Sequence, residues 1–349
     1  MISNGKIEKR GIAIFCDYIP HEILHAAGLI SQRVSGDGKV TRKARSVFPT
    51  YMCSYAMNCI DSIWANLIEY QGFVFANSCH AMETLHEFIR EYVQGKPVII
   101  IDVPRKSDPS AVEFYTSELS RFKEIIEEKF LVQISDEKLR ESIRLSNIKR
   151  RLVLEIENLI INKKLLLTAN EMISLNNCAT INSEEFINKA TQIVNIGAVQ
   201  DNILKSGPRI LVSGSIHTPM DIVQLVQEYG GKVVTCDNCN SFRSLIGEID
   251  CDEEPIRAIA QRYLRKRSCA RQTDINQRIT ELVNLVNNYK IDGVILSVVK
   301  FCPDQAYWII TMADELKRRD IPFLIIDDEY SSESSGQIHT RVQAFLERF

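Results

Sequence analysis

The segment Gly293-Val-Ile-Leu-Ser-Val-Val299, continued by Lys-Phe-Cys302-Pro303, has the pattern of a strand that runs directly into a helix. Its almost unbroken apolar run is typical of a strand that is buried on both faces of a parallel sheet. Proline is favoured at the first position of a helix, so Pro303 predicts a helix that continues over residues 304–317. Cys302 therefore lies where a buried strand ends and a helix begins.

The same alternation of strands and helices occurs near both ends of the chain. Apolar runs predict further strands over residues 11–16, 72–77, 97–102, 209–213, 232–235 and 322–327. Helical spacing predicts helices over residues 20–28, 55–67 and 81–92. Strands that alternate with helices form parallel sheets, so the predicted fold class is α/β with two Rossmann- or flavodoxin-like domains.

A helical region separates the two α/β regions. Leu119, Phe122 and Ile126 have the spacing of one apolar helix face, and similar spacing continues to about residue 204. We predict an N-terminal α/β domain over residues 1–108, a helical insert or linker over 109–205, and a C-terminal α/β domain over 206–349. The length of 349 residues agrees with two domains that each bury a core.

The composition limits the partners and the compartment. The 42 basic and 45 acidic residues give a net charge of -3, and neither sign forms a long block, which argues against nucleic acid as a partner. The sequence lacks a signal-peptide pattern and a bilayer-spanning apolar run, so we expect no membrane contact and a cytoplasmic protein. In a reducing compartment, the ten cysteines are expected to be buried thiols, metal ligands or redox residues rather than disulfides.

Cys53 and Cys79 share the position of Cys302, because each lies where a strand ends or a helix begins. Loops at the carboxyl ends of parallel strands converge on the ligand site of an open sheet. Helix N-termini also favour a thiolate over a thiol. We therefore predict that Cys53, Cys79 and Cys302 gather around one metal centre. On spacing alone, the alternative is that each is a buried, inert thiol.

Several segments have the order and pattern of a known family. Near the C-terminus they are Asp292-Gly-Val-Ile-Leu-Ser-Val-Val-Lys-Phe-Cys302, Ile321-Pro-Phe-Leu-Ile-Ile-Asp-Asp328 and Gly336-Gln-Ile-His-Thr-Arg341. Together with Tyr18-Ile-Pro-His-Glu22 and Asn77-Ser-Cys79, they resemble the 2-hydroxyacyl-CoA dehydratase and benzoyl-CoA reductase family. The resemblance covers almost the whole chain and is least distinctive in the helical middle.

The resemblance implies a cofactor, a reaction and partners. It implies that the paired α/β domains hold a 4Fe-4S cluster in the interdomain cleft through Cys53, Cys79 and Cys302. It also implies a separate ATP-dependent iron–sulfur activator, whose low-potential electron reduces an acyl-CoA to a ketyl radical for dehydration or ring reduction. The catalytic centre would then be the open iron of the cluster rather than a side chain. The chain length fits the small subunit of a heterodimer with a homologous subunit.

Two alternatives remain open at this point. Cys239 and Cys269 match extra cysteines of the double-cubane cluster proteins, in which one polypeptide supplies six thiolates to an 8Fe-9S cluster. The sixth thiolate is missing in this sequence unless Cys59 substitutes for it. In this alternative, the protein would be a stand-alone reductase, such as a homodimer. In a different class, two α/β domains around a cleft also describe metal-free small-molecule binding proteins and transferases.

Two polar residues near the C-terminus are candidate substrate residues. Gln337 and Arg341 could hold the acyl-CoA or the cluster loop, or they could only tie the last helix to the sheet. His339 interrupts the family's usual Gly-Gln-x-Arg-Thr-Arg pattern, and His80 replaces an acidic residue of many relatives, so the substrate stays undefined. The remaining cysteines and the N-terminal histidines are interpreted as packing or surface residues: Cys16, Cys178, Cys236, Cys251, His21 and His25.

Overall fold

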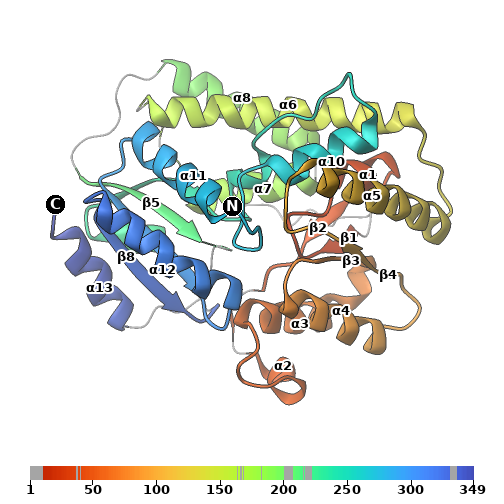
Figure 1. Cartoon of the computed structure of the whole chain (residues 1–349), viewed down its shortest axis with the longest axis horizontal. Helices are drawn as coiled ribbons and strands as arrows, with labels where there is room; N and C mark the ends of the chain where they lie inside the picture. Colours follow the sequence, from red (N-terminus) through yellow and green to blue (C-terminus); the bar gives the residue numbers. More distant parts are fainter. Residues whose placement is uncertain are drawn as a thin grey trace.

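The structure is a computed structural model, and it describes residues 11–36, 38–39, 41–162, 164–165, 167, 169–181, 183–199, 207–214, 216, 222–330 and 336–349. These residues form two four-stranded parallel sheets with helices packed against them (Figure 1). The first sheet has the order β2-β1-β3-β4, with β1 (Gly11–Ile14), β2 (Ser31–Arg33), β3 (Tyr70–Asn77) and β4 (Val98–Asp102). The second has the order β6-β5-β7-β8, with β5 (Arg209–Gly214), β6 (Lys232–Asp237), β7 (Gly293–Val299) and β8 (Phe323–Asp328).

The predicted α/β class with two parallel sheets is therefore confirmed. Every strand pair in both sheets is parallel. The strand β2 was not predicted, because its three residues are too short for a readable apolar pattern. In each sheet, the first strand in sequence lies between the second and the third. The strand order reverses there, which is where open α/β sheets bind ligands.

The helices of the first half are α1 (His21–Ala26), α2 (Arg42–Val47), α3 (Ser54–Asn66), the 3-10 helix η1 (Leu67–Glu69), α4 (His80–Tyr92) and α5 (Pro109–Phe130). The middle helices are α6 (Asp136–Ile161), α7 (Ala169–Ile181) and α8 (Ser183–Val199). The last are α9 (Ile222–Glu228), η2 (Phe242–Leu245), α10 (Pro255–Arg265), α11 (Ile275–Asn288), α12 (Pro303–Arg318) and α13 (Gly336–Leu346). None of these helices is long and apolar enough to cross a membrane.

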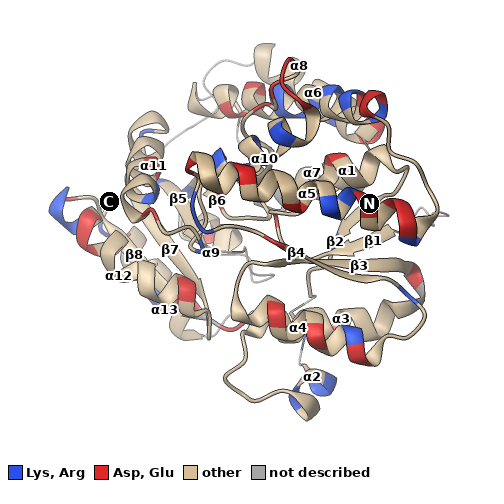
Figure 2. Cartoon of the chain, turned by 45° about the vertical axis from the view of Figure 1, so that its right-hand side comes forward, with Lys and Arg blue, Asp and Glu red and all other residues tan. Residues whose placement is uncertain are grey.

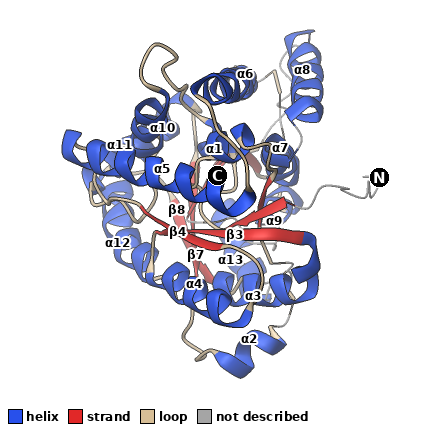
Figure 3. Cartoon of the chain, turned by 90° about the vertical axis from the view of Figure 1, so that its right-hand side faces the viewer, coloured by secondary structure: helices blue, strands red, loops and turns tan. Residues whose placement is uncertain are grey.

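Alternating side chains of β1 build the cores on the two faces of the first sheet. Ile12 and Ile14 pack in one core with residues of α1, α5 and α10. Ala13 of β1 and Phe15, the residue just after the strand, pack in the opposite core with residues of α3 and α4. This is the two-residue alternation of a strand that is covered on both faces. Figure 3 shows helices on both sides of the strands.

The long helix α6 joins the cores of the two sheets. Its early residues Leu139 and Ile143 pack in the core of the first sheet, whereas Val153 and Ile156 pack in the core of the second. Figure 1 shows α6 running along the top of the molecule above both sheets. The helix α10 also packs against α5 and joins the first core, although it comes from the second half of the sequence. The domain boundaries at residues 108 and 205 stay a prediction.

A buried ion pair fixes α6 to α1. Arg150 of α6 donates a hydrogen bond to Glu22 of α1, and their side chains are 4% and 1% exposed. The hydroxyl of Tyr263 in α10 donates to the other oxygen of Glu22 at 2.9 Å. Burial alone would raise the pKa of Glu22, but the nearby cations, Arg150 first and then Arg262, together outweigh burial and hold this pKa well below its usual range. One carboxylate thus connects three helices.

Replacing Arg150 with methionine is expected to destabilise the protein by about 3–5 kcal/mol, because Glu22 would be left buried without its cation. The matched control is Arg151→Met, one residue further along α6. Arg151 pairs with Glu248 at 2.9 Å on the surface, where such pairs contribute only about 0–1 kcal/mol. Urea unfolding of both variants measures the difference. Equal unfolding midpoints would contradict the assignment of Glu22 and Arg150 as a buried pair.

Candidate metal centre

Six of the ten cysteines line one cavity of about 120 Å³. They are Cys16, Cys53, Cys79, Cys239, Cys269 and Cys302. The structure therefore brings together the three predicted ligands and two of the second-tier residues from both halves of the chain. One water molecule needs roughly 10–15 Å³ of such space, so the cavity has room for a group of several heavy atoms. Figure 2 shows the two sheets, whose strand ends carry these loops, from a second direction.

Cys53, Cys79 and Cys302, which we name the first cysteine set, are the residues that immediately precede α3, α4 and α12. Backbone N–H groups in the first turns of these helices, those of Ala56, Met82 and Gln305, lower the pKa values of the three thiols. The strands that precede Cys79 and Cys302 end two or three residues earlier. The structure thus places these cysteines where the sequence predicts them, at strand ends and helix starts.

The turn that carries Cys302 is held in an unusual conformation. Phe301, the residue before it, has a φ of +64°, in the left-handed region that non-glycine residues seldom adopt. The Cys302 N–H donates to the carbonyl of Val299 at 3.0 Å, and the Ser54 N–H donates to the carbonyl of Lys300 at 3.4 Å. The second of these bonds ties the loop of Cys53 to the loop of Cys302.

The thiols of the first cysteine set influence one another. Burial raises the pKa of Cys79 to about 12, and the sulfur of Cys53 adds to this shift. Burial raises the pKa of Cys302 even further, and the sulfurs of Cys53 and Cys79 contribute. The helix N–H groups lower these pKa values, as expected from the sequence, but burial has the larger effect. A metal must therefore displace protons from these sulfurs.

Cys16, Cys239 and Cys269, which we name the second cysteine set, share neighbours in pairs. Burial raises the pKa of Tyr18, and the sulfurs of Cys269 and Cys16 raise it further. The Nη2 of Arg33 donates to the sulfur of Cys239 at 3.0 Å, and its Nη1 donates to the carbonyl of the same residue at 2.9 Å. The sulfurs of Cys239 and Cys269 both act on the pKa of Arg243, so the three sulfurs lie around one part of the cavity.

Cys16 is the site residue that the sequence interpretation missed. The sequence pattern alone makes it a packing residue, but it lines the cavity two residues after the end of β1. Cys79 and Cys302 occupy the same kind of position after β3 and β7. The rule that ligands bind beyond the carboxyl ends of parallel strands could have identified it.

The other cysteines lie outside the cavity lining. Cys59 is buried in the core between the first sheet and α3, with its sulfur 3.8 Å from the carbonyl oxygen of Val34. Cys236 is buried in the core of the second sheet, so it has different surroundings from Cys239. Cys178 is on α7, and Cys251 is exposed on a loop. Cys59 therefore does not take the position of a sixth cavity sulfur.

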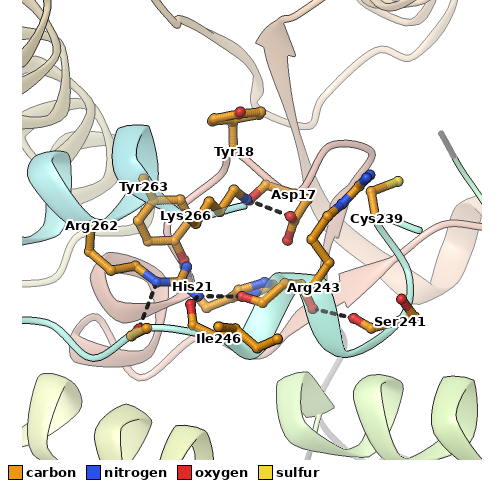
Figure 4. A network of polar contacts seen from close by, with 12 residues as sticks. Asp17, Tyr18, His21, Cys239, Ser241, Arg243, Ile246, Arg262, Tyr263 and Lys266 are labelled. Carbon is orange, nitrogen blue, oxygen red and sulfur yellow. Dashed lines mark hydrogen bonds and ion pairs between the residues drawn. The ribbon is translucent and has the colours of Figure 1, made fainter. Parts of the chain in front are cut away.

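Charged side chains form part of the cavity wall: Asp17, Arg33, Lys266, Arg267, Arg271 and Asp304. Lys266 pairs with Asp17, donates to its carbonyl at 2.5 Å, and lies 4.3 Å above the ring of Tyr18 (Figure 4). Arg271 donates to the carbonyls of Asn77, Ser78, Val103 and Pro104. It thereby fixes the turn that leads into Cys79. Basic residues outnumber acidic ones on this wall, which suits an anionic group.

Gln337 and Arg341 lie in α13, and neither lines the cysteine cavity. Both side chains are exposed. Arg341 donates to the carbonyl of Ile325 in β8 at 2.5 Å. This contact is the helix-to-sheet tie that the sequence left open as an alternative. A role for the two residues in substrate binding stays a prediction.

The residues of the cavity fit a metal–sulfur cluster better than a single metal ion. Within the described residues, no three His, Cys, Asp or Glu side chains converge closely enough to hold one ion. A multi-atom cluster instead needs sulfurs spread around a cavity, as the six cysteines are. Thiolates are soft ligands and are the usual ligands of iron–sulfur clusters.

The chain is similar to known proteins over almost its whole length. The family model described as 2-hydroxyglutaryl-CoA dehydratase, D-component, matches residues 16–349. A protein of Escherichia coli K12 named as a dehydratase subunit, YjiM, is 25% identical, with 98% of this chain and 92% of the relative covered. The beta subunit of lactoyl-CoA dehydratase from Anaerotignum propionicum is 23% identical, with coverages of 97% and 91%. A benzoyl-CoA reductase subunit of Thauera aromatica is 24% identical, with coverages of 95% and 87%.

The family match extends from the first cysteine of the cavity to the C-terminus and includes all six cavity cysteines. The relatives are named as subunits of acyl-CoA dehydratases and a reductase. Both observations agree with the resemblance noted in the sequence. The chain therefore belongs to the 2-hydroxyglutaryl-CoA dehydratase D-component family and is an enzyme component of the 2-hydroxyacyl-CoA dehydratase type.

Proposed function

We propose that this chain is the iron–sulfur component of a 2-hydroxyacyl-CoA dehydratase or benzoyl-CoA reductase type enzyme. The observation that carries the proposal is the single cavity lined by six cysteines. The thiolates of the first cysteine set would hold a 4Fe-4S cluster, and the helix N-termini before which they lie would stabilise its negative charge. Such a cluster supplies low-potential electrons and an iron without a cysteine ligand, open to a substrate oxygen.

The proposal includes partners and a compartment. Relatives are named as single subunits of dehydratases and of a reductase, which supports a multi-subunit enzyme with a homologous partner. We propose that an ATP-dependent iron–sulfur activator delivers the electrons and that the substrate is an acyl-CoA. All ten cysteines are free thiols, in agreement with the reducing cytoplasm as the compartment.

The geometry favours a second form of this function, in which both cysteine sets hold iron. Cys59 is packed in a core outside the cavity lining, so it cannot supply the sixth thiolate of a six-thiolate site in this cavity. Cys16 removes this difficulty, since it lies on the cavity with Cys239 and Cys269. In this second form, both cysteine sets would hold an 8Fe-9S double-cubane cluster, and the protein would be a stand-alone ATP-dependent reductase rather than one subunit of a larger enzyme. A metal-free binding protein or transferase would have no use for six sulfurs on one cavity.

The variant Cys302→Ser is expected to lose most of its iron after anaerobic purification, because a serine oxygen is a poor ligand for iron–sulfur clusters. Cys251→Ser is the matched control, since Cys251 is an exposed thiol outside the cavity. Iron and acid-labile sulfide per chain are measured, with circular dichroism to show that each variant folds. Full iron content in a folded Cys302→Ser variant would refute Cys302 as a ligand.

Iron counting also separates the two forms of the proposal. The six-thiolate form predicts about eight irons per chain and the three-thiolate form about four. In the six-thiolate form, Cys16→Ser lowers the iron content, whereas Cys59→Ser leaves it unchanged. About four irons per chain, unaffected by Cys16→Ser, would exclude the second cysteine set as ligands. A colourless, iron-free protein of normal stability would refute both forms.

A further inference from the structure

Among the described residues, Arg33 is the charged residue whose side chain donates directly to a cavity sulfur. It is the last residue of β2, and two nitrogens of its guanidinium donate to the sulfur and the carbonyl of Cys239 at 3.0 and 2.9 Å. Its Nε is buried and has no hydrogen-bond partner among the described residues. Leaving this buried donor without a partner has a free-energy cost.

The two cysteine sets differ in the charges around them. Next to the first set, Asp304 at the start of α12 lines the cavity. Burial and the neighbouring sulfurs raise the pKa values of Cys79 and Cys302, and the carboxylate of Asp304 raises them by a smaller amount. Arg105, at 3.8 Å from Asp304, is more than half exposed and only partly compensates this negative charge.

The second set faces cations instead. Burial lowers the pKa of Arg243, but Asp237 and then the sulfurs of Cys239 and Cys269 outweigh burial and raise this pKa above its usual range. Lys266 and Arg267 also line the cavity, and Lys266 pairs with Asp17, whose carboxylate acts on Arg33 as well. Arg271 adjoins both sets, because it is two residues from Cys269 and donates to the carbonyl of Ser78. Of these cations, Arg33 and Arg243 act on the second set, and among the described residues Arg33 is the one that hydrogen-bonds to a sulfur of that set.

Hydrogen bonds to sulfur and nearby cations stabilise the reduced, more negative form of an iron–sulfur group and raise its reduction potential. We propose that Arg33 is a positioning residue that gives the Cys239 side of the cavity the higher reduction potential, so that electrons collect there. This inference rests on the proposed function in its six-thiolate form. If both cysteine sets hold iron, an electron supplied by an iron–sulfur activator would settle on the iron bound by the second set, because Arg33 stabilises the reduced, more negative form there. Arg33 keeps its proton throughout.

The test is an anaerobic redox titration of the iron-loaded full chain, followed by electron paramagnetic resonance. The wild type is expected to show two reduction steps. Arg33→Met should move the upper step to lower potential and leave the lower step in place, at unchanged iron content. Arg33→Lys keeps the charge but cannot make both hydrogen bonds, so it should show a smaller shift in the same direction. Arg151→Met, on the surface of α6, is the control and should move neither step.

Each outcome decides the inference. An upper step that stays in place in Arg33→Met at full iron content overturns it, although the proposed function survives. If Arg33→Met loses iron, Arg33→Lys takes its place in the test. A lowered upper step in Arg33→Lys supports the inference, and an unmoved upper step overturns it. Equal shifts of both steps also overturn it, because Arg33 would then act on the whole cavity. A wild type with about four irons and one reduction step refutes the six-thiolate form and the inference together.

Discussion

The structure depends on one geometric constraint: the carboxyl ends of strands from two separate parallel sheets meet at one cavity. Cys16 and Cys79 follow β1 and β3 of the first sheet, and Cys239 and Cys302 follow β6 and β7 of the second. A parallel sheet cannot present its strand ends in any other direction, so the loops that carry the sulfurs must converge once the sheets face each other. The long helix α6, which packs in both cores, holds the sheets in that relation.

Bringing six thiols into a buried cavity has an electrostatic cost, and the wall compensates part of it. Burial keeps the first cysteine set protonated in the absence of metal, as the raised pKa values of Cys79 and Cys302 indicate. Helix N-termini and basic side chains then favour the anionic form that a metal would create. Buried cations such as Arg271 also fix the turns, because the guanidinium binds backbone carbonyls on two separate loops. The same residues thus support both the fold and the charge of the site.

Much of the fold could be predicted from the sequence, which also indicates five of the six cavity cysteines, three as ligands of one cluster and two, Cys239 and Cys269, as an alternative. The long apolar runs indicate seven of the eight strands, and Cys53, Cys79 and Cys302 could be identified because each adjoins a helix start. The short strand β2 has no readable pattern, so Arg33 at its end could not be connected with Cys239, 206 residues away. Cys16 also follows a strand, but no helix begins directly after it, so its pattern resembles that of a packing residue. Which side chains lie beside a sulfur depends on how the two sheets face each other, and local patterns do not contain that information.

The central claim is that the six cavity sulfurs hold iron. The most direct measurement is a crystal structure of the anaerobically purified protein, with diffraction data collected on both sides of the iron absorption edge. The account predicts anomalous iron density within bonding distance of both cysteine sets. Iron density beside Cys53, Cys79 and Cys302 alone would support only the three-thiolate form. A cavity without iron density in a well-ordered crystal, or iron bound elsewhere on the chain, would contradict the account.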